Sequence, residues 1–133
     1  MTRAALLLLI ATTALADQLT KAMALSLLSP GRVVPVLPGF NLTLGFNEGA
    51  SFGLLEGVMA GRPLLMGALT GALTIVFAVL AFRADHNVER AGYALVVGGA
   101  SGNIIDRLRQ GAVTDFIDLY WRDWHWPTFN VAD

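Results

Sequence analysis

Residues Pro63 to Phe82 read PLLMGALTGALTIVFAVLAF, a run of 20 residues without a charged side chain. About 20 consecutive apolar residues are what a helix needs to cross the hydrocarbon core of a bilayer, and proline suits the first turn of a helix. The stretch therefore predicts a membrane-spanning helix over 63–82. Gly67 and Gly71 have the G-x-x-x-G spacing that allows close helix approach, and core packing is a sufficient explanation for them.

The composition of the whole chain is that of a protein whose main solvent is lipid. Hydrophobic residues make up 55% of the 133 residues, charged residues make up 14%, and the mean hydropathy is +0.60. An ordinary soluble domain is about one quarter charged. The net charge of −1 provides no basic surface, so no nucleic-acid partner is expected.

The content of cysteine and histidine argues against metal and thiol chemistry. Cysteine is absent, which excludes disulfides, thiolate metal sites and a cysteine nucleophile. The two histidines, His86 and His125, are too few for a zinc site without help from carboxylates. We therefore expect no metal and no other cofactor.

A second apolar stretch predicts a helix at about 4–28, preceded by Arg3 and interrupted by Asp17 and Lys21. These two charged residues stand four apart, on one helix face, where they can pair. A signal peptide cleaved after Ala14-Leu15-Ala16 is the alternative explanation for the first half of this stretch. We favour the spanning helix, because the complete stretch is long enough to cross a bilayer.

The rest of the chain contains a third apolar stretch and two polar regions. The third predicted span, at about 90–106, follows a short polar turn, and the polar regions are about 29–62 and 107–133. Strand character in the first polar region, at Val33-Val34 and Asn41 to Phe46, predicts a small sheet or loop region. Three tryptophans in the second region suit a membrane interface.

These elements define the predicted fold. Residues 1–133 form a single α-helical, multi-pass membrane domain with three spanning helices and a small extracytoplasmic β region. If Arg3 is cytoplasmic, alternation places the regions 29–62 and 107–133 outside. The arginine distribution supports this orientation only weakly.

Aspartates are the main candidates for chemistry, because an ionisable group at membrane depth is costly and is a functional candidate by default. Solvation explains Asp85, in a polar turn, and Asp123, in a tryptophan-rich loop. Periodicity alone selects no pair among the others. The full set is Asp17, Asp85, Asp106, Asp115, Asp118, Asp123 and Asp133.

Five sequence blocks occur in a fixed order along the chain. They are DQLTK at 17–21, FNEGASFG at 46–53, GGASGNIIDR at 98–107, GAVTDF at 111–116 and FNVAD at 129–133. With these blocks in this order, on this hydropathy pattern, the chain resembles the bacterial type II signal peptidases, the lipoprotein signal peptidase family. The resemblance extends from residue 17 to residue 133.

The resemblance implies a catalytic pair, Asp115 in the V-T-D-F block and Asp133 at the end of the last block. It implies an aspartic endopeptidase of the bacterial inner membrane that works on the extracytoplasmic side, as a monomer and without a metal or cofactor. Its partners would be membrane lipid and lipoprotein precursors that carry diacylglycerol on a cysteine, which it cuts just before that cysteine. It further implies supporting or substrate-binding roles for Asp17, Lys21, Asn47, Gly99, Asn103, Asp106, Arg107, Asn130 and Ala132.

Elementary chemistry explains why two carboxylates suit this reaction. Two carboxylates a few ångströms apart do not both ionise easily, so they share one proton. The ionised member activates a water, the protonated member donates to the scissile carbonyl, and the roles then reverse. Arg107 has two interpretations, an ion pair with Asp106 or a contact that holds substrate near the lipid headgroups.

Two alternative functions compete with this one. Ser51, in a G-x-S-x-G match, and Ser101, in a G-A-S-G match, raise a rhomboid-like serine protease, although both matches are short and the strand-to-helix context of a nucleophile elbow is absent. We prefer packing or turn roles for both serines. The other alternative is a non-enzymatic small multipass protein that uses boundary aspartates for ion handling or assembly.

The chain departs from the family at its end. Family members continue beyond the second catalytic aspartate into a fourth spanning helix, and this sequence stops at Asp133. A terminal residue is poorly ordered unless it is tied down. We therefore expect little or no protease activity from the 133-residue chain by itself.

Overall fold

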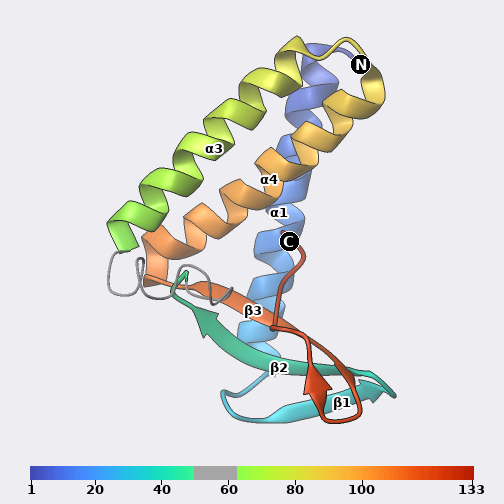
Figure 1. The fold of residues 1–133 in the computed structure, drawn as a ribbon, viewed down its shortest axis with the longest axis vertical. Coiled ribbons are helices and arrows are strands. Elements are labelled where there is room, and N and C mark those ends of the chain that lie inside the picture. Colours follow the sequence, from blue (N-terminus) through green and yellow to red (C-terminus); the bar gives the residue numbers. More distant parts are fainter. Residues whose placement is uncertain (50–62) are drawn as a thin grey trace.

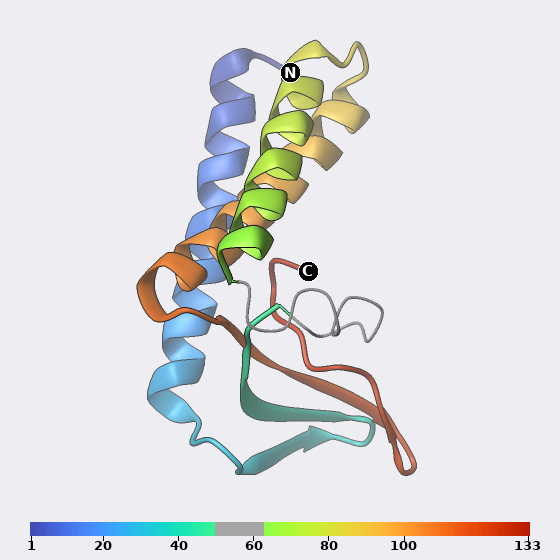
Figure 2. The same ribbon diagram turned by 60° about the vertical axis from the view of Figure 1, so that its left-hand side comes forward.

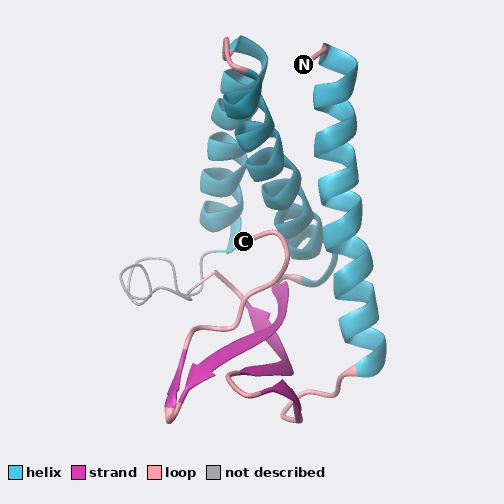
Figure 3. Ribbon diagram, turned by 90° about the vertical axis from the view of Figure 1, so that its right-hand side faces the viewer, coloured by secondary structure: helices cyan, strands magenta, loops and turns pink. Residues whose placement is uncertain are grey.

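A computed structural model describes residues 1–49 and 63–133 of the chain. Three long helices lie side by side, and a small antiparallel sheet lies at one end of them (Figures 1 and 3). The helices are α1 (Arg3–Leu27), α3 (Pro63–Arg83) and α4 (Asn87–Gln110). The strands are β1 (Val33–Leu37), β2 (Phe40–Asn47), β3 (Val113–Trp121) and β4 (Trp124–His125). The helical class and the small β region predicted from the sequence are therefore confirmed.

Two of the described helices, α1 and α3, are long and apolar enough to cross a membrane; α4 is not among them. The bounds of α1 and α3 agree with prediction to within one residue. Helix α4 exceeds the predicted 90–106 at both ends: it begins at Asn87, and its last turn continues to Gln110, where basic side chains favour a helix C-terminus. Gly111, at φ +81°, ends the helix in the left-handed conformation that glycine adopts readily.

Helix α4 packs against both other helices, and its glycines set the distance to α1. A Cβ added at Gly98 would lie 2.6 Å from the Thr13 Cβ and 2.8 Å from the Ile10 carbonyl oxygen. A Cβ added at Gly67 or Gly71 would meet no described atom within 4 Å. The packing role expected for those two glycines is therefore wrong among the described residues, and the close approach occurs at Gly98.

The sheet joins the two polar regions of the chain. Its strands are all antiparallel in the order β1-β2-β3-β4, so β2 and β3 pair although they are far apart in sequence. The register places Asn41 opposite Asp118 and Gly45 opposite Asp115. Sequence reasoning expected strands only in the first polar region and missed β3. The reason is that β3 buries aspartates as well as apolar residues, which obscures the pattern of a half-buried strand.

The two chain ends lie at different levels of the molecule. The N-terminus is beside the α3–α4 turn, and the C-terminal segment rises from the sheet towards the helices (Figures 1 and 2). Arg90 fastens the N-terminal end by donating hydrogen bonds to the carbonyl oxygens of Met1 (2.8 Å) and Ala84 (2.7 Å). The charged side chains buried in the helices, Asp17, Lys21 and Asp106, lie in the halves of α1 and α4 that lead towards the sheet.

Candidate active site

Asp115 is held by strand β3 and by two amide side chains. The residue is almost fully buried, at 2% exposure. The Asn130 Nδ2 group donates to Asp115 Oδ1 at 2.8 Å, and the Asn47 Nδ2 group donates to Asp115 Oδ2 at 3.2 Å. Asn47 is the last residue of β2, the strand that pairs with β3. Sheet pairing therefore brings this amide to the carboxyl.

Asp133 reaches the same place through the C-terminal segment, which is pinned to β3. The backbone N–H groups of Phe116 and Ile117 donate to the Phe129 carbonyl oxygen at 3.0 and 2.8 Å. Beyond that bridge, Asp133 Oδ2 accepts from the Asn130 backbone N–H at 3.2 Å. Asn130 thus holds both carboxyls that the sequence singled out, one with its side chain and the other with its backbone.

A buried ionic cluster lies behind this pair, between α1 and α4. The Lys21 ammonium contacts Asp17 Oδ2 at 2.8 Å and Asp106 Oδ2 at 3.1 Å, and both carboxylates are buried. Lys21 also donates to Asn103 Oδ1 at 2.7 Å, while Asn103 Nδ2 donates to Asp133 Oδ1 at 3.3 Å. The predicted Asp17–Lys21 pair is confirmed, and Asn103 connects it to Asp133.

The sequence left two interpretations for Arg107, and the first, an ion pair with Asp106, does not occur in the structure. Among the described residues, Lys21 is the ion-pair partner of Asp106. Arg107 instead lines a cavity of about 150 Å³ together with both candidate catalytic residues, Asp115 and Asp133. A larger cavity of about 420 Å³ also borders these two aspartates, along with the segment Trp126–Phe129. Space for a substrate chain therefore adjoins both carboxyls.

Two of the supporting residues expected from the sequence act through backbone contact. A Cβ at Gly99 would lie 2.5 Å from the Ala132 carbonyl oxygen, so only glycine lets the C-terminal segment approach α4 so closely. The Ala132 N–H donates to Asn130 Oδ1 at 2.7 Å. Gly99 and Ala132 thus set the position of Asp133. Together with the contacts above, the structure brings all eleven predicted site residues into one region.

Sequence reasoning missed three residues that complete the polar cluster. Gln18 Nε2 donates to Asp106 Oδ1 at 2.9 Å and to the Gly102 carbonyl oxygen at 3.1 Å. The Thr114 backbone N–H donates to Asp106 Oδ2 at 2.9 Å, which ties the start of β3 to α4. A Cβ at Gly102 would overlap the Asp17 carboxylate. A polar amide inside an apolar helix, as at Gln18, was the available signal, because such a group needs a partner.

The environment of Asp115 affects its ionisation. Burial raises the pKa of Asp115 above its ordinary value, and the negative charge of Asp133 acts in the same direction. Hydrogen bonds from Asn130 and Asn47 and the charge of Lys21 oppose this shift without cancelling it. A carboxyl with a raised pKa retains a proton more readily, as a general acid requires.

Asp118 was another acid that the sequence left open, and it lies in a different setting. It is buried in β3, where it accepts hydrogen bonds from Asn41 Nδ2 at 3.0 Å and contacts His125 Nδ1 at 2.7 Å. Burial alone would raise the pKa of Asp118, but the contacts with His125 and Asn41 outweigh it and lower the pKa. Asp123 is exposed, as expected from its loop position.

Of the two candidate nucleophilic serines, the structure describes Ser101. The Ser101 hydroxyl donates to the Val97 carbonyl oxygen of its own helix at 2.7 Å, a backbone contact that agrees with the preferred packing role. Ser51 lies outside the described residues. The acids therefore remain the candidates for chemistry.

Comparison with known proteins identifies the relatives of this chain. The family model described as signal peptidase (SPase) II matches residues 9–133. The chain belongs to the signal peptidase II family. Membership confirms the identification made from the sequence blocks, and with it a protease of lipoprotein processing and a membrane protein. It leaves the rhomboid-like and non-enzymatic alternatives without support.

Similar proteins and solved structures agree with the family. A lipoprotein signal peptidase of Syntrophotalea carbinolica is 42% identical over 133 aligned residues, which cover 96% of this chain and 81% of that protein. A lipoprotein signal peptidase of Coxiella burnetii is 43% identical over 122 residues, covering 90% and 74%. Two solved structures described as a bacterial membrane enzyme match with TM-scores of 0.81 and 0.80 at 30% and 29% identity. They cover 98% of this chain, and 79% and 84% of theirs.

Proposed function

We propose that Asp115 and Asp133 form the catalytic pair with which this signal peptidase II family member cleaves diacylglyceryl-modified lipoprotein precursors, just before the lipidated cysteine. The observation that supports this pair is the position of Asn130, which is bonded to both aspartates. Its side chain donates to Asp115 at 2.8 Å and its backbone N–H donates to Asp133 at 3.2 Å. One residue thus fixes both carboxyls at the edge of shared cavities.

The reaction follows from two carboxyls that share a proton. The ionised member removes a proton from a water, and the water oxygen attacks the scissile carbonyl carbon while the protonated member donates to the carbonyl oxygen. The C–N bond then breaks, and the amine of the new N-terminal cysteine receives a proton from the pair. The raised pKa of Asp115 favours it as the holder of the proton.

Arg107 is suited to bind the substrate. Its side chain lines the cavity that both aspartates border, and a guanidinium donates several hydrogen bonds in a fixed fork. We assign it to carbonyl oxygens of the precursor, at the level of the lipid ester groups. The Lys21 cluster does not line either cavity and serves to position Asn103.

The proposed topology has three membrane crossings in one domain, at α1, α3 and α4, in the bacterial inner membrane. Strands from 33–47 and 113–125 form one sheet and so lie on one side of the helices, which fits alternation of the chain through three crossings. We place this side outside the cytoplasm, where translocated precursors are found. We propose a monomer as the active form.

A cleavage assay tests the catalytic pair. The purified full-length protein, rather than residues 1–133 alone, is incubated with a diacylglyceryl-modified precursor, and release of the signal peptide is followed. Asp115→Asn and Asp133→Asn should each lower the rate by about 10² to 10⁴-fold, since each removes one acid–base group. Asp123→Asn, which changes an exposed aspartate of the β3–β4 turn, is the matched control and should leave the rate unchanged. Cleavage near the wild-type rate by either dyad variant would reject the assignment.

Single cysteines test the topology cleanly, because residues 1–133 contain none. Asp85→Cys places a thiol in the exposed α3–α4 turn, and Asp123→Cys places one in the exposed β3–β4 turn. A membrane-impermeant maleimide added to spheroplasts should label only the second variant, and both variants after lysis. Labelling of Asp85→Cys in intact spheroplasts would mean that the orientation is reversed or the number of crossings differs.

A further inference from the structure

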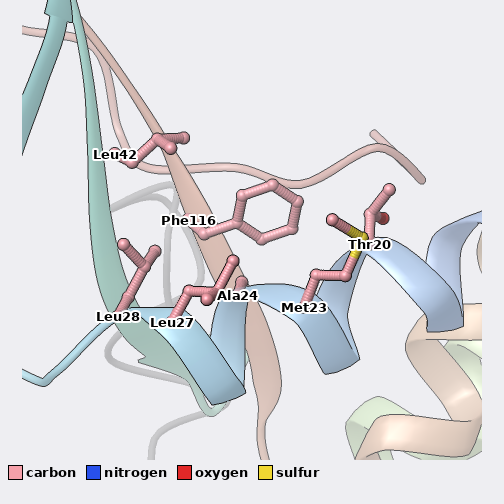
Figure 4. Close-up of a pocket in the computed structure, with 7 residues that line it drawn as sticks. All are labelled: Thr20, Met23, Ala24, Leu27, Leu28, Leu42 and Phe116. Carbon is pink, nitrogen blue, oxygen red and sulfur yellow. The ribbon is translucent and has the colours of Figure 1, made fainter.

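An apolar cavity lies where the last turns of α1 meet the sheet, away from the proposed active site. Seven residues line it, and Leu42 of β2 and Phe116 of β3 face the α1 side chains Met23, Ala24 and Leu27 across it (Figure 4). Its volume is about 180 Å³. The complete lining is Thr20, Met23, Ala24, Leu27, Leu28, Leu42 and Phe116.

The chemistry of the lining excludes water as its natural occupant. Thr20 is the only lining residue with a polar side chain, and its hydroxyl is already bonded to the Ala16 and Asp17 carbonyl oxygens at 3.0 and 2.9 Å. A buried water needs two to four polar partners, whereas an apolar cavity of about 150 Å³ stays dry and takes up hydrocarbon. The cavity is therefore built for an apolar group.

The cavity adjoins an exposed apolar side of α1. Leu15, Leu19, Met23 and Leu27 follow one another at four-residue intervals, and all are more than half exposed, so they form one stripe along the helix. Met23 and Leu27 belong both to this stripe and to the cavity lining. A chain that packs along the stripe can thus enter the cavity without crossing any polar surface.

The position of the cavity along α1 matches the depth in a bilayer at which the acyl chains of the lipids begin. Helix α1 has 25 residues and is about 37 Å long, against a hydrocarbon core of about 30 Å. The cavity lies at its last two turns, from Thr20 to Leu28. Hydrocarbon chains begin at this level, just below the headgroups.

We propose that this cavity binds one acyl chain of a bilayer phospholipid, which packs β3 against α1. The proposal rests on the membrane placement of α1 given above. Phe116 follows Asp115 directly in β3, and successive side chains of a strand point to opposite faces. The chain would therefore support the strand from the face opposite the proposed dyad. The same geometry argues against an acyl chain of the substrate, whose lipid is attached beside the scissile bond.

Photolabelling in nanodiscs tests the proposal. The probe is a phosphatidylglycerol with a diazirine along one acyl chain, and adducts are mapped by mass spectrometry. Leu42 and Phe116 should be labelled in the wild-type protein, together with Leu19 of the exposed stripe. Ala24→Leu fills the cavity and should lose the Leu42 and Phe116 adducts while keeping those at Leu19. Ala22→Leu, an equal change at an exposed position of the same helix, should keep all of them.

Each other outcome overturns the proposal. Labelling of Leu19 without Leu42 and Phe116 would mean that the cavity is closed to lipid. Loss of these adducts when lipidated precursor is added would make the substrate the occupant. Absence of label at Leu19 would remove the membrane placement of α1, and the cleavage assay would show independently whether the protease function stands. If Ala24→Leu does not fold, Met23→Trp at the exposed rim blocks the opening instead, and retained adducts would again reject the site.

Discussion

Removal of the Lys21 charge should both destabilise the protein and stop cleavage. Lys21 is 2% exposed and contacts two buried carboxylates, Asp17 at 2.8 Å and Asp106 at 3.1 Å. Lys21→Met keeps the length of the side chain and removes its charge. The variant leaves two buried carboxylates without a cation, and it removes the donor that orients Asn103.

The size of the effect follows from burial of the partners. Breaking a buried ion pair by removing one partner costs about 3–5 kcal/mol, because the remaining charge is uncompensated, whereas an exposed pair is worth about 0–1 kcal/mol. The side chains of Asp17 and Asp106 are 0% and 5% exposed. The upper range therefore applies, and we expect Lys21→Met to lower the free energy of unfolding by about 3–5 kcal/mol.

A double-mutant cycle shows whether charge is the cause. Asp17→Asn added to Lys21→Met leaves only the Asp106 carboxylate, which still accepts from Gln18 at 2.9 Å and from the Thr114 N–H at 2.9 Å. The double variant should thus be more stable than Lys21→Met alone. Unfolding is measured by detergent titration in mixed micelles. A loss below about 1 kcal/mol for Lys21→Met, the value of an exposed pair, or additive single effects would refute the reasoning.

Two further predictions concern Gly99, where the C-terminal segment approaches α4 closely, and the buried aspartate Asp118. Gly99→Ala should reduce cleavage by about tenfold or more, because its Cβ would meet the Ala132 carbonyl oxygen at 2.5 Å and displace the C-terminal segment. Gly92→Ala is the control. A Cβ at Gly92 would meet no described atom within 4 Å, so this variant should leave cleavage unchanged. His125→Ala should lower stability at pH 7 by about 1 kcal/mol, the value of one hydrogen bond to a half-exposed partner. The pKa of Asp118 is lowered in the folded state, so its contribution is present above the ordinary carboxyl pKa and is lost as the pH falls through the folded value. The difference in melting temperature between wild type and His125→Ala should accordingly shrink at low pH, and a constant difference would contradict this account.

The helices were predictable because their signal is local. The absence of charged residues over 63–82 and the spacing of Asp17 and Lys21 are each a property of a single helix. The structure contains both helix α3 and the Asp17–Lys21 ion pair. The ends of α4 were less predictable. Its last turn, up to Gln110, is polar and is held by contacts to β3, such as the bond from Gln110 Nε2 to Thr114 Oγ1 at 2.7 Å. Hydropathy contains no information about such contacts.

The sheet and the connections of the site depended on contacts between distant parts of the sequence. Strand β3 is stabilised by pairing with β2, and Asp115 is satisfied by an amide 68 positions away. The sequence blocks indicated which residues belong to the site, but not that Asn130 would contact both aspartates. Gln18 stayed unnoticed for the same reason, because its partner Asp106 is 88 positions away. The cavity beneath Phe116 is likewise a property of packing between α1 and the sheet.

Amides, and not cations, make the direct side-chain hydrogen bonds to the two aspartates, and this arrangement has a chemical reason. A cation in direct contact with both carboxyls would favour ionisation of both, and the proposed dyad would lose the proton it must share. The Lys21 ammonium is instead held between Asp17 and Asp106, and its hydrogen-bonded connection to Asp133 runs through the Asn103 amide, by bonds of 2.7 and 3.3 Å. Two carboxylates thus surround one cation behind the site, while neutral amides hold the carboxyls within it. This arrangement is consistent with the raised pKa of Asp115, since the amides lower it less than burial and Asp133 raise it. The oxygens of two of these amides are already occupied, Asn130 Oδ1 by the Ala132 N–H and Asn103 Oδ1 by Lys21, so both act on the aspartates as donors.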